Sequence, residues 1–599
     1  MRILLLSSAY NSLTQHAHVE LKALGHWLGV AVGTTGDAMR QAVDQFRPDL
    51  VLCPMLAQVI PRDVWECYTC IILHPGIVGD RGGNSLDWAI LDREQEWGVT
   101  AVEAAEHVDS GGIWATYEFK MREASKSSIY RDELTRAAVR AMLVAVRRFE
   151  SGIFVPAPLD YSRPEVRGRY RPFVKPEQRR VDWQSDRVAT ILRKIRSGDG
   201  APGVLDEICG LPVYLHGAHE EGTLVGQPGA IIARRDGAIC RAAVDGAVWI
   251  SHLKRKGEKP NDYFKLPAAM VLGERLNGVP EAPLGLHAEP HGATFRDIWY
   301  EERNDVGYVN FRFYNGAMGT GHCRRLEQAM EYAKQRPTRV IVLLGGQDFW
   351  SNGIHLNLIE AADDPAQESW DNINAMDDFV LSLLSASRQL TVAALYGSAG
   401  AGGVMMALAA DRVLAREGIV LNPHYKGMGG LYGSEYWTYN LPRRVGADLA
   451  LQLTEQCLPV SVHEAKAIGL IDDIVIQDDL GHGSFRRFRG QVVRVAENLA
   501  HHAGLADQLA EKRARREADE RVKPLEQYRL EELAEMNQNF WGEDRSYHLA
   551  RSAFVRKQPR PADLTCAAAL EQACANPRCD DARRRIDPNR CALASVGWA

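Results

Sequence analysis

One segment of the chain, residues 391–411 with the sequence TVAALYGSAGAGGVMMALAAD, restricts the choice of folds most strongly. An apolar run with β character ends in closely spaced glycines, Gly397, Gly400, Gly402 and Gly403, and a run compatible with a helix follows. Glycines at a strand-to-helix turn let a ligand approach the backbone and leave N–H groups pointing into a site. The segment therefore predicts a βα unit with a ligand site at its turn.

A second segment of the same kind lies about fifty residues earlier. Residues 340–357, VIVLLGGQDFWSNGIHLN, read as an apolar strand followed by an irregular loop that contains Gly353. The two segments, in this order and at this spacing, resemble the oxyanion-hole motifs of the crotonase (enoyl-CoA hydratase/isomerase) superfamily. The resemblance covers about residues 295–490, with charged helical sequence to 557 expected to complete it. It implies a ββα superhelix that binds a CoA thioester.

By position in these motifs, the resemblance places the two oxyanion-hole N–H groups at Ile354 and Gly402. Such N–H groups stabilise the negative charge that develops on a thioester carbonyl oxygen. Gly353 and Gly403, the neighbouring glycines, are the candidates for close contact with bound CoA.

The two glutamates with which the hydratases of this superfamily activate water are missing. Their positions hold Met405 and His424, and neither is a carboxylate, so hydration of a double bond is not the expected reaction. The glycine- and aromatic-rich segment 421–437 offers Tyr425 and Glu435 instead, where other crotonases vary their acid and base groups. We expect Glu435, with its pKa raised by burial, to be the base and Tyr425 the proton donor, although the roles could be reversed.

The N-terminal part has a different pattern, in which strand-like and helix-like runs alternate over residues 1–150. The first strand is expected at RILLLSSA, and a helix is expected over residues 18–28. Alternation of this kind predicts a parallel α/β sheet.

Residues 71–90 of this part read IILHPGIVGDRGGNSLDWAI, with His74 at a strand end and Arg81 in a glycine-rich loop, and Asp109 precedes a glycine pair further on. The set resembles the 10-formyltetrahydrofolate transferases, with their N-x-H-P-S, R-G and D-x-G-x-I motifs. The resemblance implies a Rossmann-like sheet that binds N10-formyltetrahydrofolate, with Arg81 among the binding residues. It makes His74 the group that moves a proton and polarises the formyl carbonyl, and Asp109 the carboxylate that fixes it.

The chain departs from this family at Ile72, where the formyltransferases have an asparagine two residues before the histidine. That asparagine donates to the tetrahedral oxyanion, and removing one such donor typically costs about 10²–10³ in rate. The domain is therefore either impaired or built for another acceptor than an amine. We favour another acceptor, because a thiol is a better nucleophile near neutral pH and needs less help.

The resemblance to the formyltransferases continues into a predicted small β-barrel. After a Pro- and Arg-rich linker, short strands with glycine turns predict an OB-like barrel. The stretches VDWQSDRVATILRKIRS and VGQPGAII match the C-terminal domain of methionyl-tRNA formyltransferases. The expected fold is therefore multidomain α/β. We expect a formyltransferase domain at residues 1–160, an OB-like barrel at 175–275, a crotonase domain with terminal helices at 290–560 and a disordered tail at 561–599.

The two halves together suggest one pathway, in which the CoA thiol accepts the formyl group from the folate and the second half binds formyl-CoA. This arrangement is similar to the HypX/HoxX family of hydrogenase maturation factors. The resemblance implies decarbonylation of formyl-CoA to CO and free CoA, with the CO becoming an iron ligand of [NiFe]-hydrogenase, and other hydrogenase maturation proteins as partners. The absence of the two water-activating glutamates is consistent with decarbonylation, because activated water would hydrolyse formyl-CoA to formate.

Two alternatives stay open at this point. One is a formyltetrahydrofolate deformylase that releases formate, with a regulatory crotonase half. The other is a maturation scaffold that binds CoA and folate without turning them over. Retention of His74, Asp109 and both glycine loops argues against the scaffold.

Four further residues are weaker candidates for binding. Ser12 and Gln15 follow the first strand, where they would line a folate site. Arg131 and Arg551 lie in helical sequence and would bind anionic groups of CoA or folate, although a solvated arginine explains either position equally well.

Composition excludes several classes of function. Lys and Arg (71) nearly balance Asp and Glu (77), so neither nucleic acid nor an anionic membrane surface is an expected partner. No apolar run approaches the roughly 20 residues that span a bilayer. The eleven scattered cysteines fit reduced thiols, so we expect a cytoplasmic enzyme, and no metal site is expected.

Overall fold

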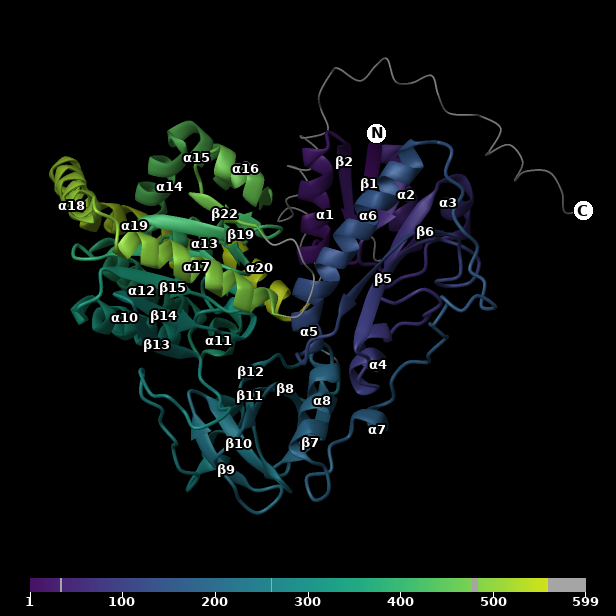
Figure 1. The fold of residues 1–599 in the computed structure, drawn as a ribbon, viewed down its shortest axis with the longest axis horizontal. Helices are drawn as coiled ribbons and strands as arrows, with labels where there is room; N and C mark the ends of the chain where they lie inside the picture. The colour runs from purple at the N-terminus through teal and green to yellow at the C-terminus, as the bar shows by residue number, and fades with distance from the viewer. Residues whose placement is uncertain (33–34, 260, 477–482, 559–599) are drawn as a thin grey trace, which may run out of the picture.

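The structure is a computed structural model that describes residues 1–32, 35–259, 261–476 and 483–558. The predicted tail at 561–599 lies outside the described residues. Figure 1 shows an N-terminal domain and a crotonase-like domain side by side, with a smaller antiparallel domain below both.

The N-terminal domain is built on a six-stranded sheet with the order β2-β1-β3-β4-β5-β6. The first four strands are parallel, namely β1 (Arg2–Ser7), β2 (Trp27–Val32), β3 (Leu50–Cys53) and β4 (Cys70–His74). The last two are antiparallel to their neighbours, namely β5 (Glu96–Glu103) and β6 (Ile113–Lys120). The prediction of a parallel sheet is thus correct only for β1–β4. The loop after His74 and the helix α4 (Ser85–Leu91) return the chain at the end of the sheet where β4 stops, so β5 runs backwards.

Helix α1 (Ser12–Ala23) begins at Asn11, whose side chain accepts a hydrogen bond from the Thr14 N–H. The prediction of a helix over residues 18–28 was wrong at its C-terminal end, because α1 ends at Ala23. Gly25 adopts a left-handed conformation (φ +80°), and the next residues enter β2 at Trp27. Helix α1 packs on α6 (Thr135–Glu150) and also contacts the crotonase-like domain, so it lies between the two halves of the molecule.

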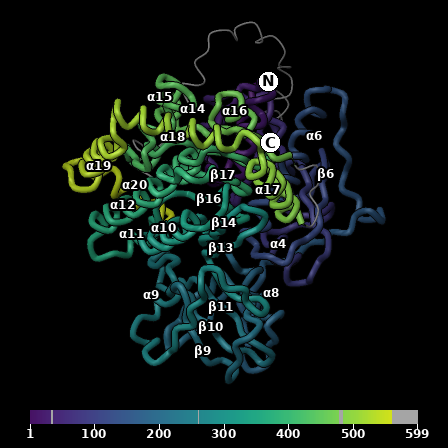
Figure 2. The backbone as a smooth tube through the Cα atoms, turned by 60° about the vertical axis from the view of Figure 1, so that its left-hand side comes forward, coloured from purple at the N-terminus to yellow at the C-terminus, as the bar shows by residue number. Residues whose placement is uncertain are grey.

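The small domain holds an antiparallel sheet with the order β7-β8-β11-β10-β9. Its strands are β7 (Val204–Ile208), β8 (Leu211–Glu221), β9 (Ile231–Arg235), β10 (Ala238–Ala243) and β11 (Gly246–Arg255), with the short β12 (Leu266–Pro267) added to β11. Helix α8 (Val188–Gly198) buries Ile191 and Ile195 against this sheet. Figure 2 shows the domain as a separate lobe.

The C-terminal domain repeats one unit, in which each turn adds a strand to each of two sheets and then a helix. The larger sheet has the order β13-β14-β15-β17-β19-β22 and the smaller one β16-β18-β20-β21. The repeat runs through β15 (Val340–Leu344), β16 (Phe349–Ser351), α12 (Pro365–Leu384), β17 (Leu390–Leu395), β18 (Ser398–Gly400), α13 (Gly402–Leu408), β19 (Arg412–Arg416) and β20 (Val420–Asn422). This is the predicted ββα superhelix.

Four strands complete the two sheets. β13 (Ile298–Arg303) and β22 (Asp473–Val475) are the edges of the larger sheet, β14 (Val306–Phe311) lies between β13 and β15, and β21 (Val460–Ser461) is an edge of the smaller sheet. Four helices follow them: α17 (Ser484–Ala500), α18 (Leu505–Val522), α19 (Leu525–Trp541) and α20 (Ser546–Val555). Helix α19 packs on α12 and on α14 (Trp437–Val445), and α20 packs on α11 (Leu356–Ala361). The terminal helices therefore cover the superhelix beside its glycine loops.

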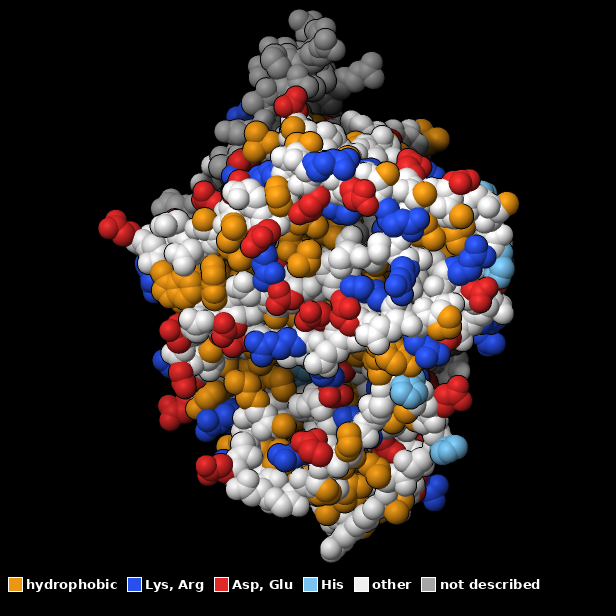
Figure 3. All heavy atoms as spheres, turned by 90° about the vertical axis from the view of Figure 1, so that its left-hand side faces the viewer, with side chains coloured by type: hydrophobic (Ala, Val, Ile, Leu, Met, Phe, Trp, Pro, Cys, Tyr) orange, Lys and Arg blue, Asp and Glu red, His pale blue; other side chains and the backbone are white. Residues whose placement is uncertain are grey.

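Charges of both signs are interspersed on the face that Figure 3 draws, with no field of a single sign. Among the described residues, no helix has the length and apolar character needed to cross a membrane.

Candidate active sites

The first site surrounds His74 at the end of β4. Its imidazole lies between two carboxylates, with Nε2 3.0 Å from Asp80 Oδ2 and Nδ1 3.4 Å from Asp109 Oδ2. The three side chains are at most 9% exposed. Gly76 leaves the room for this contact, because a β carbon there would lie 2.5 Å from both His74 Nε2 and Asp80 Oδ2.

The two carboxylates contact the ring of His74 in different ways. The contact between Nε2 and Asp80 is a hydrogen bond, whereas the contact between Nδ1 and Asp109 is an ion-pair distance. A neutral imidazole has one N–H donor and one acceptor, and an ionised carboxylate only accepts. His74 therefore lies in a buried acidic pocket in which its ring can exchange a proton with a substrate.

The loop residues around this unit fix its shape. Asp109 has a left-handed backbone (φ +55°), and the Gly82 N–H lies 3.4 Å from its Oδ2. Arg81 donates through Nε to the Val108 carbonyl at 2.9 Å, so its guanidinium holds the loop that carries Asp109. Ile72 is half-buried in β4 and packs in an apolar cluster, so it offers no hydrogen-bond donor in place of the missing asparagine.

Gln15 and Ser12 lie in the first turn of α1. Gln15 joins the two halves, since its Nε2 donates to the Tyr10 carbonyl at 3.3 Å and its Oε1 accepts from Asn422 Nδ2 at 3.0 Å. The Ser12 hydroxyl lies 3.4 Å from His16 Nδ1 in the same helix.

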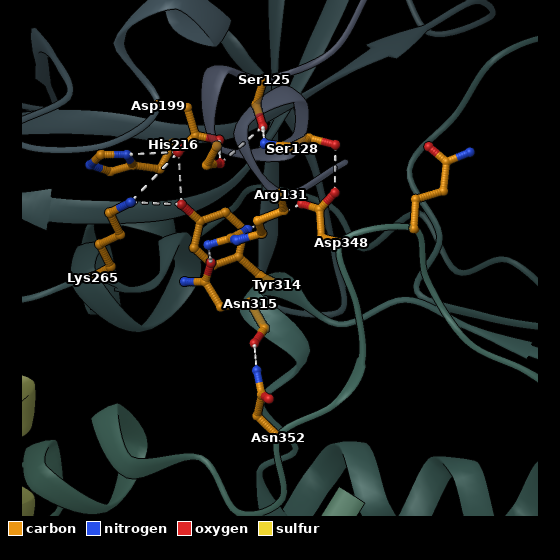
Figure 4. A network of polar contacts seen from close by, with 12 residues as sticks. Ser125, Ser128, Arg131, Asp199, His216, Lys265, Tyr314, Asn315, Asp348 and Asn352 are labelled. Atoms are coloured by element: carbon orange, nitrogen blue, oxygen red, sulfur yellow. Dashed lines mark hydrogen bonds and ion pairs between the residues drawn. The ribbon is translucent and has the colours of Figure 1, made fainter. Parts of the chain in front are cut away.

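Arg131 lies at the junction of the domains (Figure 4). Its guanidinium donates to Asn315 Oδ1 at 2.8 Å and to Asp348 Oδ2 at 3.3 Å, and it stacks 4.6 Å from the centre of the Phe349 ring. In the same view, Asp199 receives a hydrogen bond from Tyr314 Oη at 2.8 Å. The junction thus joins side chains of all three domains.

The second site is formed by the two glycine loops, which meet as the resemblance implied. Gly353 has φ +75°, and a β carbon on it would lie 3.2 Å from the Gly402 nitrogen. A β carbon on Gly403 would overlap the Ser351 carbonyl oxygen. Larger residues would separate the loops, so glycine is required at both positions. Ile354 follows Gly353 in the first loop and forms a β-bridge with Met318.

Tyr425 and Glu435 form a buried pair against this meeting point. Tyr425 Oη donates to Glu435 Oε2 at 2.5 Å and lies 3.0 Å from the Ser434 carbonyl. A β carbon on Gly402 would overlap the Glu435 carboxylate, so that carboxylate lies directly over the predicted oxyanion-hole glycine. The structure therefore brings Tyr425, Glu435, Gly402 and Gly353 into one site.

The electrostatics of this site favour protonated acids. Burial, with the nearby Asp377 carboxylate, raises the pKa of Glu435 to about 8. Burial also raises the pKa of Tyr425 well above its ordinary value, with the Glu435 charge contributing in the same direction. His424 has its pKa lowered to about 4 by burial, and its Nε2 is buried without a hydrogen-bond partner among the described residues. Met405 is fully buried in α13.

Arg551 lies apart from these groups in α20. It is 4% exposed, and it pairs with Glu360 Oε2 at 3.1 Å and with His548 Nδ1 at 2.9 Å. Its guanidinium therefore fastens α20 to α11 in this structure.

Sequence reasoning missed three acidic residues that the structure brings into the two sites. Asp80 was detectable, since it lies in the same glycine-rich loop six residues after His74. Asp377 of α12 accepts the Glu435 N–H, and Glu532 of α19 accepts the Tyr436 N–H. No local motif marks either acid.

These features define a protein with a formyltransferase-like half and a crotonase-like half. Family models agree: "Formyl transferase" matches residues 28–146, "Formyl transferase, C-terminal domain" residues 174–265, and "Enoyl-CoA hydratase/isomerase" residues 303–545. The methionyl-tRNA formyltransferase of Bacillus licheniformis is 25% identical over 237 residues, which is 38% of this chain and 73% of its own.

Two relatives span both halves. The hydrogenase maturation factor HoxX of Bradyrhizobium diazoefficiens is 47% identical over 560 residues, covering 94% of this chain and 95% of its own. The crystal structure of HypX from Aquifex aeolicus in complex with tetrahydrofolic acid is 43% identical, with a TM-score of 0.90, covering 95% of this chain and 98% of that one. The chain belongs to the HypX/HoxX family of hydrogenase maturation factors. This confirms the family and the multidomain fold predicted from the sequence.

Proposed function

We propose that this maturation factor makes CO in two steps. The N-terminal half transfers the formyl group of N10-formyltetrahydrofolate to the thiol of CoA. The C-terminal half then splits formyl-CoA into CO and free CoA, and the CO serves as the ligand of the hydrogenase iron. Both substrates are small molecules.

The buried Tyr425–Glu435 pair against Gly402 is the observation that carries the second step. Decarbonylation needs a base for the formyl hydrogen, donors for the carbonyl oxygen, and protection from water. Glu435 is a carboxylate with a pKa raised to about 8 by burial, which suits a base near neutral pH. Met405 and His424 occupy the positions where hydratases carry the glutamates that activate water.

The proposed reaction balances without an added oxidant or reductant. Glu435 takes the formyl hydrogen as a proton, the C–H electron pair becomes the lone pair on the carbon of CO, and the C–S electron pair leaves on sulfur. The proton then passes to the thiolate, and Tyr425, hydrogen-bonded to Glu435 Oε2, orients the carboxylate or relays the proton. The Ile354 and Gly402 N–H groups would bind the carbonyl oxygen before the C–S bond breaks.

The His74 unit supports the first step. Attack of the CoA thiol on the formyl group releases one proton and returns one to the leaving folate nitrogen. His74, hydrogen-bonded to Asp80 and 3.4 Å from Asp109, is placed to carry out this proton exchange. A relative at 43% identity was crystallised with tetrahydrofolic acid, which supports folate as the substrate of this half.

Five residues remain proposed contacts for the substrates. Gln15 and Arg131 lie where the halves meet, and Ser12 and Arg81 lie nearer the folate half. Arg551 would act through the packing of α20, because its guanidinium is held by Glu360.

One incubation separates the candidate functions. The protein is mixed with formyltetrahydrofolate and CoA, and headspace CO, formate and remaining folate are measured together. The proposal requires CO that depends on CoA. Formate without CO would indicate a deformylase, and loss of neither substrate would indicate a scaffold.

A further inference from the structure

The backbone that carries Glu435 is strained. Glu435 and Tyr436 both have left-handed backbones, with φ +61° and +57°. Neither is glycine, and a non-glycine residue in this region needs other interactions to hold it. Two carboxyl groups from distant helices supply these interactions.

Asp377 of α12 and Glu532 of α19 accept the backbone N–H groups of this segment. The Glu435 N–H donates to Asp377 Oδ1 at 2.8 Å. The Tyr436 N–H donates to Glu532 Oε2 at 3.0 Å, and the Thr438 N–H donates to Glu532 Oε1 at 2.8 Å. Since α14 starts at Trp437 and has no side-chain cap of its own, Glu532 caps this helix from another part of the chain.

Ser434 links the two acids. Its hydroxyl oxygen lies 2.9 Å from Asp377 Oδ2 and 3.1 Å from Glu532 Oε2. A hydroxyl has one hydrogen and can fully satisfy only one ionised carboxylate. The second contact is a hydrogen bond if the other carboxyl group is protonated and donates to the serine oxygen. Asp377 and Glu532 are 0% exposed, so bulk solvent does not reach either carboxyl group.

We propose that Asp377 and Glu532 are positioning residues for Glu435, sharing one proton through Ser434. In this arrangement they hold the strained segment 434–438 and set the pH at which Glu435 becomes a base. The inference deepens the proposed decarbonylation and rests on it for its catalytic meaning, although the proton sharing is a property of the protein alone.

The surroundings of the cluster are consistent with a shared proton. Burial, with the Asp378 charge contributing, raises the pKa of Asp377 to about 7. Burial, with the Asp377 charge contributing, raises the pKa of Glu532 to about 8. Among the described residues one guanidinium is near the cluster, with Arg529 Nε 3.7 Å from Asp377 Oδ2, and it also pairs with Asp378. The other titratable groups that face the three acids are Cys323, Tyr425, Tyr432 and Tyr436. One cation cannot balance three ionised carboxylates, so the cluster retains protons near neutral pH.

The test is the pH dependence of CO release from formyl-CoA in the full chain with Glu532→Gln or Asp377→Asn. Either substitution removes an ionisable neighbour of Glu435. Asp377→Asn keeps an oxygen that can accept the Glu435 N–H, whereas Glu532→Gln keeps an acceptor for only one of the two N–H groups that Glu532 binds. We expect the midpoint of the profile to move about one pH unit towards acid, as for loss of a nearby like charge, while the plateau stays within about threefold. The control is Glu535→Gln, on the exposed face of the same helix, with an unchanged midpoint.

A purely structural role would give another result, namely a lower rate and a lower melting temperature at every pH with the midpoint unmoved. That outcome in both variants would overturn the inference. If the parent protein makes no CO, the proposed function fails, and infrared pH-difference spectra then test the proton sharing alone. The carboxyl band lost in Glu435→Gln should titrate at lower pH in Glu532→Gln, and an unmoved band refutes it.

Discussion

Replacement of Glu435 by glutamine tests the proposed base most directly. The change keeps the size of the side chain and its contact with Tyr425 and removes only the ability to take a proton. A general base contributes roughly 10²–10⁴ in rate, so CO formation should fall by at least about a hundredfold. Consumption of formyltetrahydrofolate in the presence of CoA should continue, because His74 lies in the other half, and formyl-CoA or formate should accumulate.

The raised pKa of Glu435 adds a quantitative expectation. With a pKa of about 8, roughly one molecule in ten has an ionised Glu435 at pH 7, so the parent rate should rise almost tenfold per pH unit below pH 8 and level off above it. The residual rate of CO formation by Glu435→Gln should not increase with pH in this way. Headspace CO measured from pH 6 to pH 9 gives both results, with Glu511→Gln on the exposed α18 as control. CO at the parent rate from Glu435→Gln would refute the assignment, and His424 would be the next candidate.

Four further results are expected. Tyr425→Phe should reduce CO formation in the same assay, less strongly than Glu435→Gln, because only a hydroxyl is lost. An unchanged rate would exclude a role of the Tyr425 hydroxyl in the reaction. His74→Ala or Asp109→Asn should abolish consumption of formyltetrahydrofolate while CoA binding, measured by calorimetry, stays intact; full transfer by either would end the formyltransferase argument. The protein should not hydrate crotonyl-CoA, and robust hydration would show that the motif register is wrong. Finally, the folded pKa of Glu435 lies above its unfolded value of 4.5, so stability falls by up to about 1.4 kcal/mol per pH unit as pH rises from about 4.5 to 8. Glu435→Gln should therefore melt at a higher temperature than the parent at pH 8, and an equal or lower melting temperature would contradict this.

The parts of the fold that local sequence determines were predictable. The two glycine loops identified the ββα superhelix because close approach of two backbones leaves no alternative to glycine at Gly353 and Gly403. The direction of β5 was not predictable from alternation alone, since it depends on which end of the sheet the chain returns to after His74. The end of α1 was missed because Gly25 was taken as part of the helix.

Residues of the second site were predictable only where a single sequence motif contains them. Tyr425 and Glu435 are ten positions apart in one glycine-rich loop, and folding closes the loop so that their side chains meet. Glu532 lies in a helix with ordinary amphipathic sequence, and only the packing of α19 on α12 and α14 brings it to the strained segment. From sequence alone, a charged side chain on such a helix is interpreted as solvent-exposed, and only its packing neighbours show that it is buried.

Both halves depart from their parent families in a related way. The formyltransferase half has Ile72 in place of an oxyanion donor, and the crotonase half has Met405 and His424 in place of the acids that activate water. Each half instead contains buried, hydrogen-bonded carboxyl groups, Asp80 with His74 in one and Asp377 with Ser434 in the other. The crotonase half thus lacks the acids with which hydratases activate water, and both halves have buried carboxyl groups at their candidate sites. This combination suits the proposed reaction, because each proposed step moves a proton and neither consumes water.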